Sequence, residues 1–309
     1  MTLTETVSRV DPLSSMQPLA SRVRICDPGA STTIQDGGRA GYAHLGITAS
    51  GPVDRAAAHL ANRLTGNAED AAVFENLFGG LTLDLTESRY VAVTGAPVEV
   101  RVDGRVVREP ERVFLRAGQR LSVGRPTAGI RVYVSVAGGV RAEKTFGSAS
   151  TDALSGLGPR PLTAGDEFEL SAATDEVPDV PLELARSRYP NGTVDLRFRW
   201  GPRDSLFDLK DRQSLMSTRW TVGSNSNRVG VRLAGPPLAI GSVDLRSEGM
   251  ALGAIQVPPS GEPIIFLADH PVTGGYPVIG VVTEDDLDLL GQAAVGSSVR
   301  FSELYDKFP

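Results

Sequence analysis

The sequence predicts a mainly β protein with a few short helices. Three observations support this class: the apolar runs are short, turn-forming Gly, Pro, Asp and Asn residues separate them, and only a few segments show helical spacing. The chain has 309 residues, of which 41% are hydrophobic, so it can bury a sizeable core. This length favours two domains or one large β unit.

Strand-like runs begin at Val23, where the polar, Ser- and Thr-rich start of the chain ends. Asp103-Gly104 separates two such runs and is typical of a two-residue hairpin turn. The close spacing of the runs indicates hairpins and an antiparallel architecture. The clearest runs are 90–94, 98–102, 113–115, 130–136, 168–170, 194–198 and 264–268.

A helix is predicted after Asp54, whose carboxylate can cap the first turn. Gly66 is placed to end this helix, because glycine readily adopts the left-handed conformation found there. A shorter helix is predicted at about 206–216. Apolar residues of the first helix recur at i, i+3, i+4 and i+7: Ala57, Leu60, Ala61 and Leu64.

A further helix is predicted near the C-terminus. Thr283 precedes the acidic run 284–286, and negative charge stabilises the first turn of a helix. Leu287 and Leu290 lie on one side of this helix, and Gly291 is its predicted stop.

The chain divides into two predicted β domains, 22–171 and 191–309. Residues 1–21 lack periodicity and are rich in Ser, Thr and Pro, so a flexible leader is expected there. Residues 172–190 hold several prolines and acidic residues between the two β-rich blocks. This segment is therefore the predicted linker or crossover.

The charge and cysteine content exclude several classes of protein. A formal net charge of −6 argues against a nucleic-acid or anionic-membrane binder. No segment approaches the roughly 20 apolar residues of a membrane helix, and no secretory signal is evident. Cys26 is the single cysteine and cannot form an internal disulfide, which agrees with a reducing compartment. We expect a cytoplasmic protein.

A polar, glycine-rich segment, 32–54, is the first candidate site. Its glycines allow the backbone to approach a ligand closely. Gln35, Asp36 and Arg39 supply an amide, a carboxylate and a cation. The alternative interpretation is that Asp36 and Arg39 pair with each other and the glycines form bulges.

The segment 247–277 is the second candidate site. An apolar run ends at Asp269 and His270, and residues at a strand end are rigidly held but open to a ligand. The glycine-rich turn 273–277 follows. Gln256, between apolar neighbours, is either a hydrogen-bonded core amide or a substrate contact.

Several common catalytic and binding motifs do not occur. The chain has no GxxxxGK[ST] phosphate loop, so any ATP must bind in another way. One cysteine and three scattered histidines cannot supply a usual zinc site, and no metal site is predicted for this chain. No GxSxG nucleophile motif is found.

A series of short motifs lies in order between residues 23 and 285. They include Gln35-Asp36, Gly38-Arg39, Gly41-Tyr42, Ser50-Gly51-Pro52, Asn62-Arg63-Leu64, Glu75, Gly79-Gly80, Gly147-Ser148, Ser150-Thr151-Asp152, Ser247-Glu248-Gly249, Gly253-Ala254-Ile255-Gln256-Val257-Pro258 and Thr273-Gly274-Gly275-Tyr276-Pro277. In these motifs the chain resembles the family of 5-oxoprolinase C subunits, also known as allophanate hydrolase subunit 2, with its Kip-type, biotin-dependent carboxyltransferase-like domain.

The resemblance implies two cyclophilin-like β-barrel domains with a cleft to which both contribute. It also implies a B-type, Kip inhibitor-like partner subunit that forms a composite site with this chain, and a LamB/YcsF-type A subunit. Where relatives often have Arg-Gln-Thr, this chain has His270-Pro271-Val272, so the substrate stays open. The site residues carried over are Asp36, Arg39 and Asp269 as catalytic, and Gln35, Asp54, Arg228, Gln256, Thr273, Gly274, Gly275 and Tyr276 as substrate-binding.

The first functional hypothesis is a subunit of an ATP-dependent 5-oxoprolinase, with ATP and Mg²⁺ bound by the complex. Arg39 or Arg228 would meet phosphate charge in such a site. Asp36 or Asp269 would hold Mg²⁺ or act as a base.

Two other functions are compatible with the same resemblance. One is a biotin-dependent carboxyltransferase component that acts on urea or a related amide; other chains would then supply the biotin carrier and the ATP-binding region. The other is a non-catalytic, Kip-type regulatory binding protein.

Overall fold

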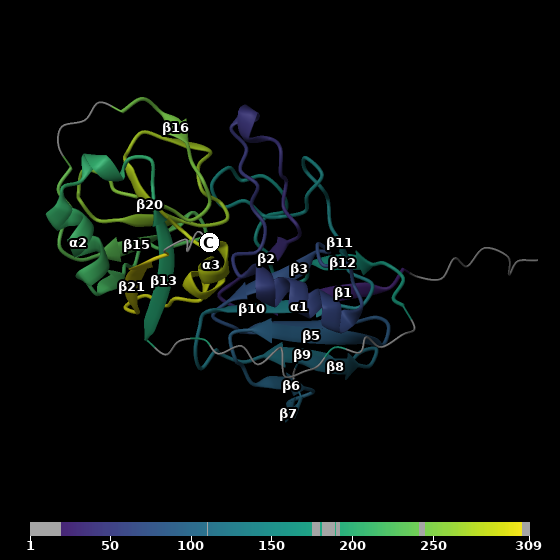
Figure 1. Ribbon diagram of the computed structural model, residues 1–309. Coiled ribbons are helices and arrows are strands. Elements are labelled where there is room, and N and C mark those ends of the chain that lie inside the picture. The colour runs from purple at the N-terminus through teal and green to yellow at the C-terminus, as the bar shows by residue number, and fades with distance from the viewer. Residues whose placement is uncertain are drawn as a thin grey trace, which may run out of the picture.

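The computed structural model describes residues 20–109, 111–174, 180, 189, 192–240 and 245–304. It shows two β units side by side, which confirms the predicted mainly β fold (Figure 1). The predicted leader, apart from its last two residues, and most of the predicted linker lie outside the described residues.

The first unit contains two sheets. The seven-stranded sheet has the order β11 (Val140–Arg141), β12 (Glu167–Leu170), β1 (Arg22–Pro28), β4 (Leu81–Leu85), β9 (Arg120–Val123), β6 (Val100–Val102) and β7 (Arg105–Val106). The five-stranded sheet has the order β2 (Ser31–Gln35), β3 (Val73–Leu77), β10 (Arg131–Val136), β5 (Arg89–Gly95) and β8 (Arg112–Leu115).

One hydrophobic core lies between these two sheets. Ile25 and Leu83 from the larger sheet and Phe74 and Val134 from the smaller one are all fully buried in it. Helix α1 (Arg55–Thr65) covers the other face of the five-stranded sheet, where Leu64 and its neighbours pack against β3, β5 and β10. Strands β3, β5 and β10 are therefore covered on both faces.

The second unit is a closed barrel of seven strands. Along β13, buried and exposed residues alternate, as expected for a strand with one face in a core. The order is β13 (Thr193–Trp200), β20 (Val278–Val282), β17 (Ala254–Gln256), β18 (Ile264–Phe266), β15 (Gly230–Ala234), β14 (Trp220–Val222) and β21 (Ser298–Glu303). The short strands β16 (Glu248–Gly249) and β19 (Thr273–Gly274) form a separate two-stranded ribbon.

The prediction of an antiparallel architecture is wrong at one place. Strands β13 and β21 pair in parallel, from Thr193 opposite Ser298 to Phe198 opposite Glu303. The other six neighbouring pairs of the barrel are antiparallel. Seven strands that alternate in direction cannot close without one parallel pair, so closure itself requires this exception.

The predicted helices are confirmed. Asp54 caps α1 by accepting a hydrogen bond from Ala57 N at 3.0 Å, and Gly66 ends the helix with φ 74°. Helix α3 (Glu284–Gly291) has its predicted acidic first turn, although the Thr283 side chain makes no capping hydrogen bond. Helix α2 (Leu209–Ser217) follows a short 3₁₀ turn, η3 (Asp204–Leu206), and a similar turn, η1 (Ala43–Leu45), interrupts the glycine-rich loop.

The Asp103-Gly104 turn has the expected conformation. The φ angles of 48° and 77° at these residues are those of a type I′ hairpin turn, and Val102 pairs with Arg105 across it. No helix among the described residues is long and apolar enough to cross a membrane.

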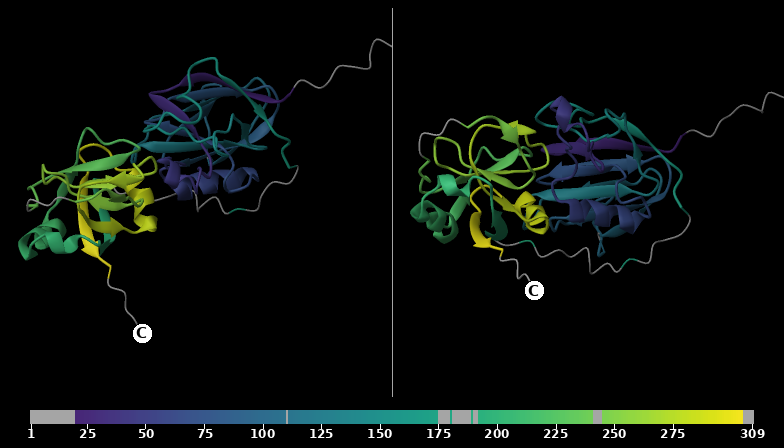
Figure 2. Two further views of the ribbon diagram at one scale, coloured as in Figure 1. Left: turned by 90° about the horizontal axis from the view of Figure 1, so that it is seen from above. Right: turned by 45° about the horizontal axis from the view of Figure 1, so that its top comes forward.

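Helix α3 lies where the barrel meets the first unit (Figure 2). Its Asp288 carboxylate accepts hydrogen bonds from Arg55 N at 2.8 Å and Ala56 N at 3.3 Å, the first backbone amides of α1. Helix α3 of the second unit thus accepts hydrogen bonds from the first backbone N–H groups of α1, which have no partner within α1 itself. The contact joins α1 to α3, whose Leu290 lines the cleft described next.

Candidate active site between the two units

A cleft of about 630 Å³ opens between the first unit and the barrel. This volume is within the range of about 300–1,000 Å³ found for small-molecule sites. Its apolar wall includes Leu77, Phe78, Ile130, Val231, Leu290 and Val295. Its polar side chains include Ser31, Thr33, Thr151, Asp152, Ser226 and Asn227. Three arginines, Arg131, Arg160 and Arg228, also line it.

Arg228, one of the arginines that line the cleft, joins the two units. Its guanidinium donates to both oxygens of Asp269 within the barrel, with Nε 2.8 Å from Oδ2 and Nη2 3.0 Å from Oδ1. It also donates to Glu75 Oε1 at 2.5 Å and to the Gly51 carbonyl at 2.6 Å, both in the first unit. Burial alone would lower the pKa of Arg228, but Glu75 and Asp269 together raise it, so the side chain is a fixed cation.

Glu75, on β3, is the matching anion of the first unit. Its Oε2 accepts hydrogen bonds from Val53 N at 3.0 Å and from the Tyr133 hydroxyl at 2.8 Å, and Arg131 forms a second ion pair at 3.6 Å. Burial alone would raise the pKa of Glu75, but Arg228 and Arg131 hold it below the usual range. Glu75 is therefore ionised and fully paired.

Asp54 and Gln292 form a second polar bridge between the units. Gln292 Nε2 donates to Asp54 Oδ2 at 2.7 Å, and its Oε1 accepts from the amides of Ile130 and Arg131 at 3.0 and 2.8 Å. The Tyr189 hydroxyl also donates to Asp54 Oδ2. Burial, and then the nearby Asp288, raise the pKa of Asp54 to about 6.

Gln35, Asp36 and Arg39 lie in the first unit, behind the cleft wall. Asp36 accepts hydrogen bonds from Gly38 N, Ala149 N and the hydroxyls of Ser148 and Ser150. Its carboxylate thus joins the glycine-rich loop to the segment 148–150.

Arg39 and Gln35 hold the same part of the fold. Arg39 donates to the carbonyls of Thr145 and Ser150, and Gln35 Nε2 donates to Thr33 Oγ1 and Thr151 O, both at 3.0 Å. The alternative interpretation was that Asp36 and Arg39 pair with each other. Among the described residues, no ion pair joins these two side chains. Both side chains instead hold one shared segment.

Asp269 connects the two predicted clusters. Ser50 Oγ, from the glycine-rich loop, lies 2.6 Å from Asp269 Oδ1 and 3.2 Å from Thr151 O, the carbonyl that Gln35 also contacts. Ala153 N donates to Asp269 Oδ2 at 2.9 Å. Asp269 is fully buried, and through Ser50 and Ala153 it holds the cleft wall formed by Thr151 and Ala153.

Gln256 and the turn after β19 lie apart from this cleft. Gln256 Nε2 contacts the Met250 sulfur at 3.6 Å and the Tyr276 carbonyl at 3.3 Å. A side chain added at Gly274 would collide with Gln256 Nε2, so the glycine permits this close packing. Thr273 is exposed, Gly275 has open space beside its Cα, and Tyr276 is 48% exposed at the edge of the ribbon.

Of the eleven predicted site residues, only Arg228 lines the cleft itself. Sequence reasoning missed Glu75 and Gln292 as members of the polar bridges. Glu75 is one of the motif residues that carry the resemblance, so the sequence did contain a signal that could have marked it as a site residue. Gln292 follows the last of those motifs and resembles an ordinary residue at a helix end.

The described residues offer no cluster of metal-binding side chains. They contain no group of three or more His, Cys, Asp or Glu side chains that could hold a metal ion. The oxygens of Asp36 and Asp269 already accept hydrogen bonds from protein donors.

Comparisons with known proteins place the chain in a family. Residues 45–303 match the family model of the carboxyltransferase domain, subdomain A and B. The chain belongs to the carboxyltransferase-domain family. Within this family it is 35% identical over 283 residues to the 5-oxoprolinase C subunit of Escherichia coli, covering 90% of both chains. It is 32% identical to urea amidolyase of Saccharomyces cerevisiae, covering 94% of this chain and 17% of that protein.

Two solved structures are similar over most of this chain. The crystal structure of TTHA0988 superposes with a TM-score of 0.82 at 34% identity, covering 93% of this chain and 57% of that one. That of K. lactis urea amidolyase has a TM-score of 0.85 at 30% identity, covering 95% of this chain and 19% of that one. The chain thus spans just over half of one longer chain and a small part of the other.

Proposed function

We propose that this chain is the C subunit of an ATP-dependent 5-oxoprolinase, which opens the lactam of 5-oxoproline to give glutamate. The observation that carries the proposal is a match along the whole length. The chain covers 90% of the 5-oxoprolinase C subunits of Escherichia coli and Haemophilus influenzae, and is itself covered to 90%. The urea amidolyases that it resembles are several times longer.

The cleft has the groups that a small cyclic amide needs. Its apolar wall, with Ile130 and Val231, suits the methylene edge of the ring. Asn227 Oδ1 accepts from Val229 N at 2.9 Å, while its Nδ2 donates no hydrogen bond within the described residues and is available to a ligand carbonyl. In this proposal Asn227 orients the lactam oxygen, on which negative charge develops as the ring opens.

The predicted site residues act in this proposal mainly by holding the cleft in shape. Arg228 lines the cleft, and Asp269 behind it holds the guanidinium in place. Asp36, Arg39 and Gln35 fix the segment 145–151, which ends at the cleft residue Thr151. A site held by hydrogen-bonded supporting residues keeps its geometry to the accuracy that catalysis requires.

We further propose that the B-type and A-type partner subunits complete the site and that the complex binds ATP and Mg²⁺. A lactam is a poor electrophile, and ATP cleavage supplies the driving force for opening it. The ring of 5-oxoproline alone does not fill 630 Å³, so the cleft has room for a partner side chain beside it.

The test is reconstitution with the A-type and B-type partners, with each chain omitted in turn. ATP-dependent loss of 5-oxoproline and formation of glutamate are measured. We expect glutamate only when all three chains are present. Loss of turnover in the Asp269→Asn complex, with folding intact, would support the role of the cleft, and no glutamate from a well-folded wild-type complex would reject the proposal.

Carboxyl transfer to urea or a related amide is the second candidate function. It is favoured by the family model and by the match to K. lactis urea amidolyase. The same preparation, supplied with carboxybiotin and urea, would then consume carboxybiotin. Transfer without any 5-oxoprolinase activity would favour this second function.

A further inference from the structure

The cleft must provide a partner for one carboxylate if its substrate is 5-oxoproline. The ring of this compound carries a single carboxylate besides the lactam, and a carboxylate that leaves water needs a paired cation or several donors. Among the described residues, the cations that line the cleft are Arg131, Arg160 and Arg228. The question is which of them is free to bind a ligand.

Arg131 and Arg228 are already committed to the protein. Arg228 holds Glu75, Asp269 and the Gly51 carbonyl with its three nitrogens. Arg131 pairs with Glu75 and donates to the Gly291 carbonyl. Their side chains are only 11% and 7% exposed. Drawing either toward a ligand would leave a buried carboxylate without its counter-charge, which is costly.

Arg160 is different in both exposure and pairing. Its side chain is 61% exposed, and its guanidinium forms a two-pronged pair with Asp166 at 2.7 and 2.9 Å. The pair is exposed to solvent, so water and salt weaken it more than they weaken the buried pairs of Arg131 and Arg228. Asp166 also accepts from Thr163 N at 2.8 Å, so its carboxylate stays in place when the arginine leaves.

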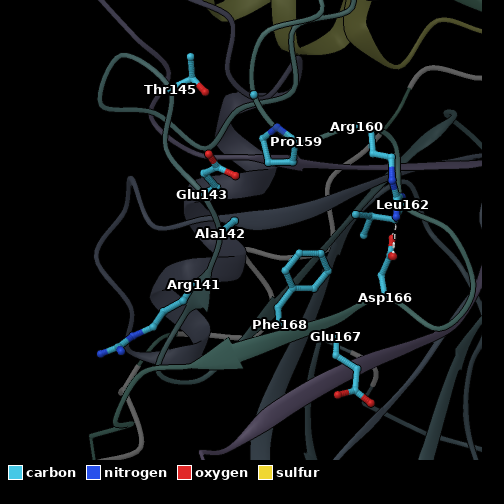
Figure 3. A pocket seen from close by; sticks show the side chains of 11 residues that line it. Arg141, Ala142, Glu143, Thr145, Pro159, Arg160, Leu162, Asp166, Glu167 and Phe168 are labelled. Carbon is cyan, nitrogen blue, oxygen red and sulfur yellow. Dashed lines mark hydrogen bonds and ion pairs between the residues drawn. The ribbon is translucent and has the colours of Figure 1, made fainter.

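The position of Arg160 allows it to serve the cleft. The first unit has a second cavity, of about 390 Å³. Figure 3 shows side chains that line it, with Arg160 reaching down to Asp166. Pro159 and Arg160 line both this cavity and the cleft between the units. The segment is therefore a wall shared by the two spaces, and rotation of the Arg160 side chain would carry its guanidinium from the second cavity to the cleft.

We infer that Arg160 is the residue that binds the substrate carboxylate, and that it pairs with Asp166 when the cleft is empty. The inference rests on the proposed function and extends it. A guanidinium presents two parallel N–H groups to a carboxylate, so the substrate replaces Asp166 with an equivalent partner. Arg160 thus determines substrate binding and specificity, and it takes no part in the chemical step.

The test compares Arg160→Gln with wild type in the complete complex with its A-type and B-type partners. Losing a charge-assisted contact made equally in ground and transition states raises KM and leaves kcat unchanged. We expect KM for 5-oxoproline to rise roughly 10- to 100-fold. Arg160→Lys, which keeps the charge but not the fork, should recover part of this loss.

Arg141→Gln is the matched control, because Arg141 lines the second cavity and not the cleft. Its KM should equal that of wild type. An unchanged KM in Arg160→Gln, or an equal rise in both variants, would overturn the role of Arg160 while the proposed function stands.

A binding measurement separates this inference from the proposed function. Calorimetric titration of the complex with 5-oxoproline and with 2-pyrrolidinone, the same ring without the carboxylate, gives the contribution of the carboxylate. We expect wild type to prefer 5-oxoproline and Arg160→Gln to lose that preference without weaker binding of 2-pyrrolidinone. A wild-type complex that neither binds nor turns over 5-oxoproline would reject the proposed function itself.

Discussion

Two buried carboxylates at the junction of the units have pKa values shifted in opposite directions. Glu75 lies between Arg228 and Arg131, whose charges more than offset the effect of its burial. Asp54 accepts hydrogen bonds only from neutral donors, Ala57 N, Gln292 and Tyr189, so burial dominates. The nature of the partner, a cation or a neutral dipole, decides the sign.

Asp54 makes the protein less stable as pH rises. Its pKa is raised from 3.8 to about 6, so the folded state holds a proton that the unfolded chain has already released. Between about pH 4 and pH 6 the free energy of unfolding therefore falls with rising pH, and the penalty is complete above the folded pKa. The Asp54→Asn variant cannot titrate, and we expect a flatter pH dependence from urea unfolding over pH 4–7.

The control for this experiment is Asp70→Asn, at an exposed position, which should follow wild type. Asp288, whose pKa burial also raises, keeps some slope in both variants. Identical slopes for wild type and Asp54→Asn would contradict the assignment.

At the scale of elements, helix α1 is stabilised at its ends by both local and distant hydrogen bonds. Its own N-cap, Asp54, satisfies Ala57 N, while Asp288 of α3 satisfies the amides of Arg55 and Ala56. Its C-terminus ends on Gly66 in the left-handed conformation, with the Gly66 amide donating to Arg63 O at 3.2 Å. The C-terminus of α1 is thus stabilised by residues close in the sequence, whereas its N-terminus needs a residue from each unit.

Gly66 gives a direct test of the local end. Alanine at φ 74° is strained, so Gly66→Ala should lower the free energy of unfolding by about 1–2 kcal/mol. Asparagine tolerates this conformation better, so Gly66→Asn should lose clearly less. Denaturant unfolding of the three proteins measures the effect, and equal losses in the two variants would show that backbone strain is not the cause.

At the scale of the whole molecule, polar bridges rather than a shared hydrophobic core hold key points of the junction. The main clusters of buried apolar side chains largely follow the two units, each with its own core. Arg228 spans the boundary by contacting Glu75 and Gly51 on one side and Asp269 on the other. Such charged contacts depend on direction and distance, so they fix how the cleft walls face each other.

Removing Arg228 should therefore affect stability before any effect on chemistry is considered. Arg228→Met leaves Glu75 with only Arg131 as counter-charge and leaves Asp269 without an ionic partner, and we expect a loss of about 3–5 kcal/mol in the free energy of unfolding. Arg232→Met, at an exposed position on β15, should change it by less than about 0.5 kcal/mol. Similar losses in both variants, measured by denaturant unfolding, would show that the bridge contributes little.

Much of the fold could be predicted because it depends on neighbouring residues. The Asp54 cap, the Gly66 stop and the Asp103-Gly104 turn each act within a few residues of the chain. Alternation along β13 likewise shows which side chains enter the core. Short-range preferences of this kind can be recognised from the order of residues alone.

The resemblance implied a cleft between the two units, but the side chains that form it were decided only by the tertiary structure. Arg228 and Glu75 are separated by 153 residues, and Gln292 and Asp54 by 238, so no local pattern indicates that they meet. Asp36 and Arg39 are polar residues in a glycine-rich loop whether they bind a ligand or hold a neighbouring segment, and only their contacts distinguish the two. The sequence by itself determined the β class, the helix ends and the turns, because these follow from local backbone preference. The closure of the barrel and the set of side chains that face the cleft follow from long-range packing.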